Sequence, residues 1–236
     1  MAVLVSPAAY KPTPMALALH TDIAVEDWGL IPYEESWHRQ RELLHRVQRR
    51  EAPNTLVLCE HPTVITIGRT GSRQHVLLPE PLLRARGIPV FEVERGGDVT
   101  LHNPGQLVGY PIFRLSDYRE DLHWFVREIE QCIIELLAEF GIIGHRIPGL
   151  TGVWVAGERK ICAIGLHVSR WVSWHGFALN VNNRLEEFAY IVPCGIVDKG
   201  VTSIARERGA AVPLAEVKSL CADIFRRHFP ESSSLR

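Results

Sequence analysis

The residue with the clearest capacity for covalent chemistry is Cys194. It lies between Pro193 and Gly195, two residues that interrupt regular structure, and no hydrophobic period accounts for its position. A thiol on a tight turn can be exposed and can lie near backbone N–H groups, which favours the thiolate that attacks carbonyl carbons. Because an ordinary thiol has a pKa of about 8.5, it also needs a partner that accepts its proton or stabilises its charge. Cys194 is therefore a candidate nucleophile.

The other four cysteines have a simpler interpretation. Cys59, Cys132, Cys162 and Cys221 each fall within an apolar run, where a free cysteine packs as a small hydrophobic residue. Five cysteines in 236 residues is an odd number and does not describe a disulfide framework. We therefore expect a reducing compartment.

Lys160 is a candidate for proton transfer because it opens a run of apolar residues. A lysine in this position is commonly a solvated strand end. A lysine that points inward instead loses solvent, which lowers the pKa of an amine and allows proton exchange near neutral pH. The sequence alone leaves both interpretations open.

A glycine-rich segment, residues 95–106, is the third unusual feature. It combines Arg95, Thr100 and His102 with three glycines, which allow the backbone to approach a ligand closely. The segment reads either as an ordinary turn or as a ligand cradle. No metal is expected, because the chain lacks C-x-x-C, H-E-x-x-H and H-x-x-x-H spacings. It also lacks G-x-S-x-G, P-loop and G-x-G-x-x-G motifs, so serine hydrolase, P-loop and dinucleotide-binding functions are disfavoured.

The elements that must position these residues follow from the hydrophobic periods. Apolar residues spaced at three and four predict helices, and β-branched or alternating runs predict strands. The expected helices cover residues 33–50, 79–86, 122–140 and 214–229. The expected strands cover residues 55–59, 63–67, 88–93, 152–155, 160–168 and 172–181, and the first two are expected to pair. This order predicts an α+β (mixed α/β) fold with a mixed, largely antiparallel sheet flanked by helices.

Length and charge limit the remaining possibilities. Lysine and arginine total 26 and aspartate and glutamate 27, so the formal charge is 26 − 27 = −1, without the basic field of a nucleic-acid binder. No apolar run approaches the ~18–20 residues of a membrane-spanning helix. No linker divides the chain, so we expect one catalytic domain over residues 15–236 behind a flexible, proline-containing tail over residues 1–14. The cytoplasm is the expected location.

Seven segments, in this order and spacing, resemble one family, the lipoyl(octanoyl) transferases of protein lipoylation. The resemblance covers residues 55–205. The segments are Glu60-His61-Pro62 with Thr66-Ile67-Gly68-Arg69, then residues 95–106, Gly152-Val153-Trp154-Val155, Lys160-Ile161-Cys162-Ala163-Ile164-Gly165, residues 175–181, Pro193-Cys194-Gly195-Ile196 and Val201-Thr202-Ser203-Ile204.

The resemblance implies a fold, a reaction and roles for individual residues. The fold is that of the catalytic domain of biotin and lipoate protein ligases. The reaction, in lipoate biosynthesis, moves an octanoyl group from octanoyl-acyl carrier protein to a lysine of a lipoyl-accepting domain, without a cofactor. Acceptors in the family are the lipoyl domains of 2-oxoacid dehydrogenase complexes and the glycine cleavage H protein. Cys194 would carry the acyl group as a thioester, and Lys160 would lower the cysteine's pKa and act as acid and base.

The resemblance also implies an acyl-binding surface. Its residues are Arg95, Gly96, Gly97, Asp98, Val99, Thr100, Leu101, His102, Ala163, Ile164, Gly165, Gly176, Phe177 and Ala178. Their glycines would let backbone line a narrow acyl tunnel and supply N–H donors to an oxyanion. The chain departs from the family at Leu101, where tyrosine is usual, and at Asn103, where glycine is usual. These departures leave open the acyl chain length and the geometry of the loop.

Three other functions compete with this one. An ATP-dependent lipoate or biotin protein ligase on the same fold would activate a free acid as an adenylate and would not need Cys194. A non-catalytic module would only bind acyl domains. A thioesterase would use the thiol but would transfer the acyl group to water.

Overall fold

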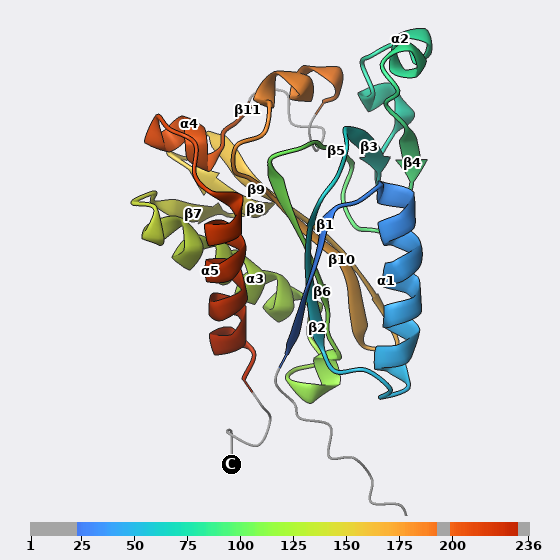
Figure 1. Ribbon diagram of the computed structural model, residues 1–236, viewed down its shortest axis with the longest axis vertical. Coiled ribbons are helices and arrows are strands. Elements are labelled where there is room, and N and C mark those ends of the chain that lie inside the picture. Colours follow the sequence, from blue (N-terminus) through green and yellow to red (C-terminus); the bar gives the residue numbers. More distant parts are fainter. Residues whose placement is uncertain (1–22, 193–198, 231–236) are drawn as a thin grey trace, which may run out of the picture.

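A large mixed sheet forms the centre of the molecule (Figure 1). The computed structural model describes residues 23–192 and 199–230; Cys194 and the expected tail lie outside them. The strands of this sheet are β1 (Ala24–Leu30), β2 (Thr55–Glu60), β6 (Gln106–Ile112), β7 (Gly144–Ile147), β8 (Leu150–Val155), β9 (Arg159–Ser169), β10 (Val172–Asn180) and β11 (Gly200–Val201). They run in the order β1-β2-β6-β10-β9-β8-β7, with β11 beside β9. Within this sheet, the β1–β2 and β11–β9 pairs are parallel and the other described pairs are antiparallel, so the predicted mixed, largely antiparallel sheet is confirmed.

A second, small sheet holds β3 (Val64–Ile67), β4 (Val90–Glu92) and β5 (Val99–His102) in the order β4-β3-β5. The expected pairing of the strands at residues 55–59 and 63–67 is therefore wrong, because β2 and β3 belong to different sheets. Between them, His61 is buried and its Nδ1 lies 2.7 Å from the Ile31 carbonyl oxygen. Pro62 follows and has no N–H for a hairpin ladder. The chain consequently leaves the large sheet at this point.

Helices cover both faces of the large sheet (Figure 1). The α-helices of the described residues are α1 (Tyr33–Gln48), α2 (Glu80–Ala85), α3 (Leu122–Glu139), α4 (Ile204–Arg208) and α5 (Leu214–His228). Successive strand residues point to opposite faces. Leu58 and Leu179 accordingly pack with residues of α3 and α5, such as Phe225, whereas their neighbours Val57 and Ala178 pack with residues of α1. The large sheet therefore lies between two apolar cores.

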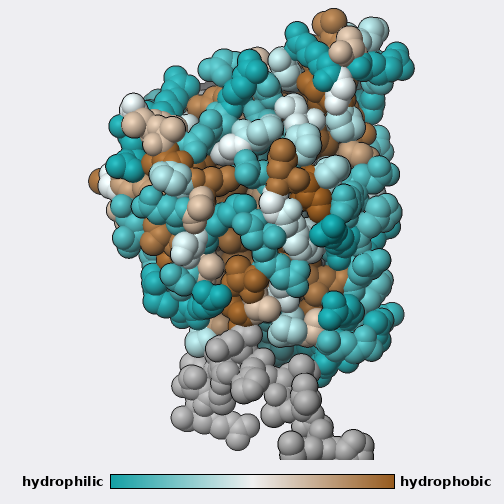
Figure 2. Space-filling view, in the orientation of Figure 1, coloured by the Kyte–Doolittle hydropathy of each residue, from teal (hydrophilic) through white to brown (hydrophobic). Residues whose placement is uncertain are grey.

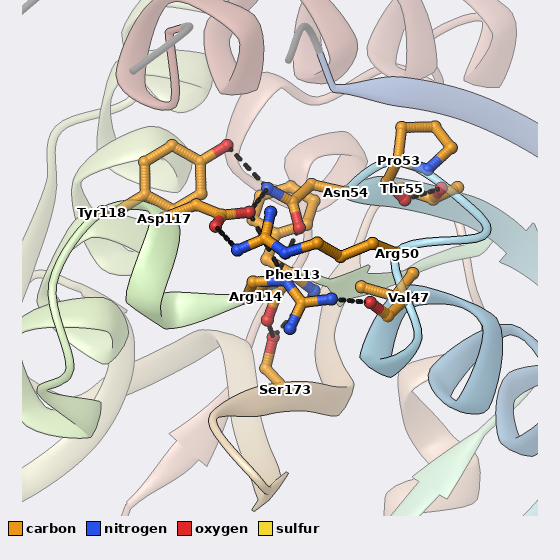
Figure 3. A network of polar contacts seen from close by, with 10 residues as sticks. All are labelled: Val47, Arg50, Pro53, Asn54, Thr55, Phe113, Arg114, Asp117, Tyr118 and Ser173. Atoms are coloured by element: carbon orange, nitrogen blue, oxygen red, sulfur yellow. Dashed lines mark hydrogen bonds and ion pairs between the residues drawn. The ribbon is translucent and has the colours of Figure 1, made fainter. Parts of the chain in front are cut away.

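Hydrogen bonds fix one end of this sheet (Figure 3). Asn54, just before β2, accepts a hydrogen bond from the Arg114 N–H at 2.7 Å and donates to Asp117 and Tyr118. The Arg114 side chain donates to the Val47 carbonyl in the last turn of α1. The Ser173 hydroxyl accepts from the Phe113 N–H at 3.1 Å. We call this group the polar clamp; it joins α1 to the ends of β2, β6 and β10.

None of the helices in the described ranges is long and apolar enough to cross a bilayer. On the face drawn in Figure 2, polar residues surround separate apolar patches.

Every helix and strand predicted from the periods is present, with ends that agree within two residues. The four cysteines predicted to be packing residues are buried and free. Strands β1, β5, β6, β7 and β11 and the short helix α4 were not predicted. Strand β6 contains Gly109 and Pro111, which weaken any strand pattern, yet the strand is fully buried. Gly109 is required there because a Cβ would lie 2.1 Å from the Phe177 ring.

Candidate active site

A cavity of about 490 Å³ lies where the large and small sheets face one another. Its lining comes from residues 95–100 and 102, from residues 163–165 on β9 and from residues 175–178 on β10. Tyr33, Val108 and Tyr110 complete it. Every predicted acyl-binding residue except Leu101 therefore lines one cavity. The sequence did not indicate Tyr33, Val108, Tyr110 or His175 as lining residues; of these, only His175 lies in a segment of the family pattern.

Leu101 faces away from the cavity because strand β5 alternates. Val99 and Leu101 pack with Ile65 and Ile67 in the outer core of the small sheet. Thr100 and His102 are the intervening residues, and both line the cavity. The unusual residue at position 101 thus contributes to the small sheet's core rather than to the cavity wall.

Asn103 also has a structural role. It is buried, and its Nδ2 donates to the Arg184 carbonyl at 2.9 Å and to Glu187 Oε2 at 3.0 Å. Its Oδ1 accepts from Asn183 Nδ2 at 2.9 Å. A glycine could make none of these side-chain bonds, so this departure from the family fastens the β5–β6 turn to the residues after β10.

The hydrogen bonds of Arg95 fix the backbone that surrounds the cavity. Its guanidinium donates to the Thr66 hydroxyl and carbonyl and to the Gly96 carbonyl, at 2.7–3.1 Å. The Gly96 N–H donates to the Leu166 carbonyl at 2.8 Å, which lays this loop across β9. Gly165 permits the crossing, since a Cβ there would lie 2.7 Å from the Gly96 oxygen. Because the Gly96 N–H is already used, it is not an oxyanion donor.

Asp98 connects the cavity to the chain that leads toward Cys194. One of its oxygens lies 2.5 Å from His75 Nδ1, and the other accepts from the Ser72 N–H at 3.2 Å. His75 ends the short 3-10 turn η1 (Arg73–His75), and its carbonyl accepts from the Val192 N–H at 2.8 Å. Asp98 therefore anchors the point at which the chain enters residues 193–198.

Lys160 points inward, which settles the two interpretations left open by the sequence. Its side chain is 8% exposed, and Nζ lies 4.7 Å from the centre of the Trp154 ring. It lines a smaller cavity of about 300 Å³. Thr100, Ala163 and Ala178 line both this cavity and the larger one, so the two are neighbours that share a wall. The described structure thus places Lys160 at one end of the predicted acyl-binding surface.

Buried, neutral aromatic and imidazole groups lie at, and just behind, another part of the wall of the larger cavity. His61 Nδ1 donates to the Ile31 carbonyl, so Nε2 accepts from the Tyr110 hydroxyl at 2.6 Å. Burial lowers the pKa of His61 to about 4 and raises that of Tyr110. His102 Nδ1 donates to Gln106 Oε1 at 2.8 Å, since the Gln106 amide nitrogen donates elsewhere. Burial lowers the pKa of His102 to about 3, so this wall carries no charge near neutral pH.

His175 is held in a strained conformation beside the cavity. Its φ of 54° is rare for a residue with a side chain, and the ring stacks on Trp174 with centroids 4.2 Å apart. Its Nε2 lies 3.7 Å from Glu94 Oε2, and Arg41 is also paired with Glu94. These neighbours hold the pKa of Glu94 at about 2, whereas burial lowers the pKa of His175. The neutral imidazole and the carboxylate are not hydrogen-bonded, but they place His175 of β10 beside the loop that carries Arg95.

Comparison with known proteins decides the family. The model of the lipoyl protein ligase A/B catalytic domain matches residues 32–226. An octanoyltransferase from Cytophaga hutchinsonii is 46% identical over 214 residues, covering 83% of this chain and 88% of that protein. One from Gloeobacter violaceus is 48% identical over 202 residues, covering 85% and 87%. The chain belongs to the octanoyltransferase family.

Solved structures show that the fold of this family member is shared more widely. A bipartite lipoate protein ligase from Thermoplasma acidophilum superposes with a TM-score of 0.69 at 17% identity, covering 92% of this chain and 91% of that chain. A biotin protein ligase from Aquifex aeolicus gives 0.52 at 14% identity, covering 88% and 70%. The expected likeness to biotin and lipoate protein ligases is confirmed for the fold.

Across residues 23–192 and 199–230, no three His, Cys, Asp or Glu side chains are grouped to hold a metal ion. The polar groups brought together at the site are instead Lys160, Thr100, His102 and the Asp98–His75 pair.

Proposed function

We propose that this chain transfers an octanoyl group from octanoyl-acyl carrier protein to a lysine of lipoyl-accepting domains, through a thioester on Cys194. The observation that carries the proposal is the position of Lys160, buried in a small cavity that shares a wall with the cavity built from the predicted acyl-binding residues. Acceptors would be the lipoyl domains of 2-oxoacid dehydrogenase complexes and the glycine cleavage H protein. Four buried free cysteines among the described residues suit a reducing location such as the cytoplasm.

The dimensions of the site support a medium-length acyl chain. Lys160 and Gly165 are separated by about 16 Å of strand at ~3.3 Å per residue, and an extended octanoyl chain fits within that length. The floor is made smooth by small residues, because Ala163 pairs with Ala178 and Gly165 with Gly176.

The reaction divides into two balanced steps. In the first, the Cys194 thiolate attacks the donor thioester; a C–S bond forms, the donor C–S bond breaks, and the carrier thiolate leaves with a proton from the ammonium of Lys160. In the second, the acceptor amine attacks, a C–N bond forms, the Cys194 thiolate leaves, and neutral Lys160 takes the amine proton. Exchange between thioesters is nearly balanced and amide formation drives the sequence, so ATP is not required.

Intact-protein mass spectrometry tests the proposal. Incubation with octanoyl-acyl carrier protein should add one octanoyl group to the wild-type chain and none to Cys194→Ala. Addition of a lipoyl domain should remove the group from the enzyme and place it on the domain. An adduct that persists in Cys194→Ala, or no adduct on active enzyme, would overturn the thioester mechanism.

The same experiment separates the competing functions. Transfer that requires ATP and free octanoate indicates a ligase. Octanoate released at the transfer rate without an acceptor indicates a thioesterase. Binding of the acyl domain with no transfer under any of these conditions indicates a non-catalytic module.

A further inference from the structure

The wall shared by the two cavities carries a single hydroxyl group. Thr100, Ala163 and Ala178 are the residues that line both the acyl cavity and the Lys160 cavity. Since two of them are alanines, Thr100 is the one member of this wall with a polar side chain. A thioester carbonyl that reacts near Lys160, with its chain in the larger cavity, must pass this wall.

The Thr100 hydroxyl faces the large sheet. Thr100 lies directly opposite Thr66 in the antiparallel β3–β5 pair, so the two side chains share a face. The Thr66 hydroxyl on this face accepts hydrogen bonds from Arg95, which itself lines the acyl cavity. The neighbouring residues Val99 and Leu101 are buried in the small sheet's outer core. Thr100 is about nine-tenths buried and lines both cavities.

The other uncharged polar side chains at the Lys160 cavity are already engaged. Gln106 donates to the Leu101 carbonyl and to Asn180, and accepts from His102. Asn180 donates to the Thr202 carbonyl and accepts from Gln106 and Asn183. Thr100, by contrast, lines both cavities, so its hydroxyl is within reach of a group bound in either.

We propose that Thr100 is a catalytic residue, whose hydroxyl donates a hydrogen bond to the acyl carbonyl oxygen as that oxygen becomes an oxyanion. The inference rests on the proposed transfer reaction. When the nucleophile attacks, the carbonyl π electrons move to oxygen; the Thr100 O–H donates to that charge and keeps its proton. When the intermediate collapses, the electrons return and the C–S bond breaks. A fixed donor in a water-excluded site stabilises this state without reorganisation.

Two substitutions isolate the hydroxyl. Thr100→Val keeps the shape and the strand preference but removes the donor, whereas Thr100→Ser keeps the donor and removes a methyl group. With octanoyl-acyl carrier protein and a lipoyl domain, Thr100→Val should lower kcat about 10²-fold with KM nearly unchanged, as loss of an oxyanion donor does. Thr100→Ser should stay within a few-fold of wild type. The pH dependence of kcat should keep its midpoint in both, because neither substitution changes a titrating group.

Several outcomes would overturn the inference. These are wild-type kcat in Thr100→Val, an equal loss in both variants, or a change in KM alone, which would mean that Thr100 only lines the cavity. Thermal unfolding shows whether each variant folds, and Thr100→Ala against Thr100→Ser repeats the comparison if valine disrupts β5. If the wild-type chain forms no octanoyl adduct, the proposed function fails; if it forms one and Thr100→Val transfers normally, only this inference fails.

Discussion

The Lys160 side chain is buried, and it lies against the face of an aromatic ring. Its Nζ lies over the Trp154 ring, and the ammonium of Lys199 lies 6.0 Å from the centre of the same ring. An aromatic face attracts a cation by ~0.5–2 kcal/mol without supplying a base that would take its proton. The Trp154 ring therefore gives the buried end of Lys160 a favourable contact.

Replacing Lys160 tests whether its charge is used. Lys160→Met keeps most of the aliphatic chain over Trp154 but removes the exchangeable protons, and octanoyl transfer should fall by ~10²–10⁴-fold, as for other general acid/base groups. Lys199→Met is the matched control, because Lys199 faces the same ring but lines neither cavity. It should retain activity within threefold in the same steady-state assay. Near-wild-type transfer by Lys160→Met would reduce Lys160 to a packing residue.

Among the elements, the crossing of the loop at Arg95 over strand β9 sets the width of the acyl cavity. The Gly96 N–H bonds to the Leu166 carbonyl, and the absence of a side chain at Gly165 lets the two backbones approach. Glu94, the residue before Arg95, lies 3.7 Å from His175 Nε2 on β10 and is paired with Arg41 of α1. Backbone contacts rather than long side chains thus determine the shape of the site.

Gly165→Ala should push the loop at Arg95 and Gly96 away from strand β9. Its Cβ would lie 2.7 Å from the Gly96 oxygen, closer than real contacts allow, and overpacking of this kind costs ~1–3 kcal/mol. The free energy of unfolding in urea should fall by that amount, and kcat/KM for octanoyl transfer should fall with it. Gly200→Ala is the control on neighbouring β11, where the nearest atom to the new Cβ lies at 3.7 Å. Equal effects of the two substitutions would contradict a specific role for the crossing.

The sequence predicted the elements with strong local patterns and missed those made by long-range contacts. The helix α3 shows a regular apolar period, and its ends were placed within one residue. Strand β6, with Gly109 and Pro111, is a strand because β2 and β10 pair with it on both sides. The predicted β2–β3 pairing failed because the burial of His61 between the two sheets depends on Ile31 and Tyr110, residues far away in the chain.

The residues of the candidate site also divide into those that the sequence predicted and those that it missed. Three of the ordered family segments, residues 95–106, 160–165 and 175–181, contribute residues to one cavity, because their spacing reflects the fold that brings them together. Tyr33 and Tyr110 reach the same cavity from α1 and β6, and neither carries a local pattern that distinguishes it from a packing aromatic residue. Leu101 was assigned to the acyl-binding surface by its position in a segment, although strand alternation turns it to the other face.

At the scale of the whole molecule, the two sheets enclose a group of histidines that are neutral because they are buried. The polar clamp fixes the end of the large sheet where β10 begins (Figures 1 and 3). The cavity is lined by residues 175–178, farther along β10. Burial lowers the pKa of His61 to about 4 and of His102 to about 3, and it also lowers that of His175. Closure of the small sheet over the large one therefore makes stability depend on pH.

The sign of this dependence follows from proton binding. An unfolded histidine has a pKa of about 6.5, so below that pH the unfolded chain binds protons that the folded chain refuses. Stability is therefore fully present above about pH 6.5 and is lost as the pH falls toward the folded pKa values of about 4 and 3. Each histidine contributes a slope of about 1.4 kcal/mol per pH unit within its window. The free energy of unfolding should fall by up to about 2.7 kcal/mol per pH unit near pH 5 from His61 and His102 together.

Urea unfolding at intervals between pH 8 and pH 4 measures this slope. His102→Gln removes one of the two groups, so its slope near pH 5 should be lower than that of the wild type by about 1.4 kcal/mol per pH unit, whatever its stability at pH 8. His38→Gln, at an exposed position on α1, should keep the wild-type slope. The slope rather than the absolute stability is the test, because His102→Gln also changes the bond to Gln106. A wild-type stability that stays level from pH 6.5 to pH 4 would show that the buried histidines take up protons in the folded state as readily as in the unfolded chain.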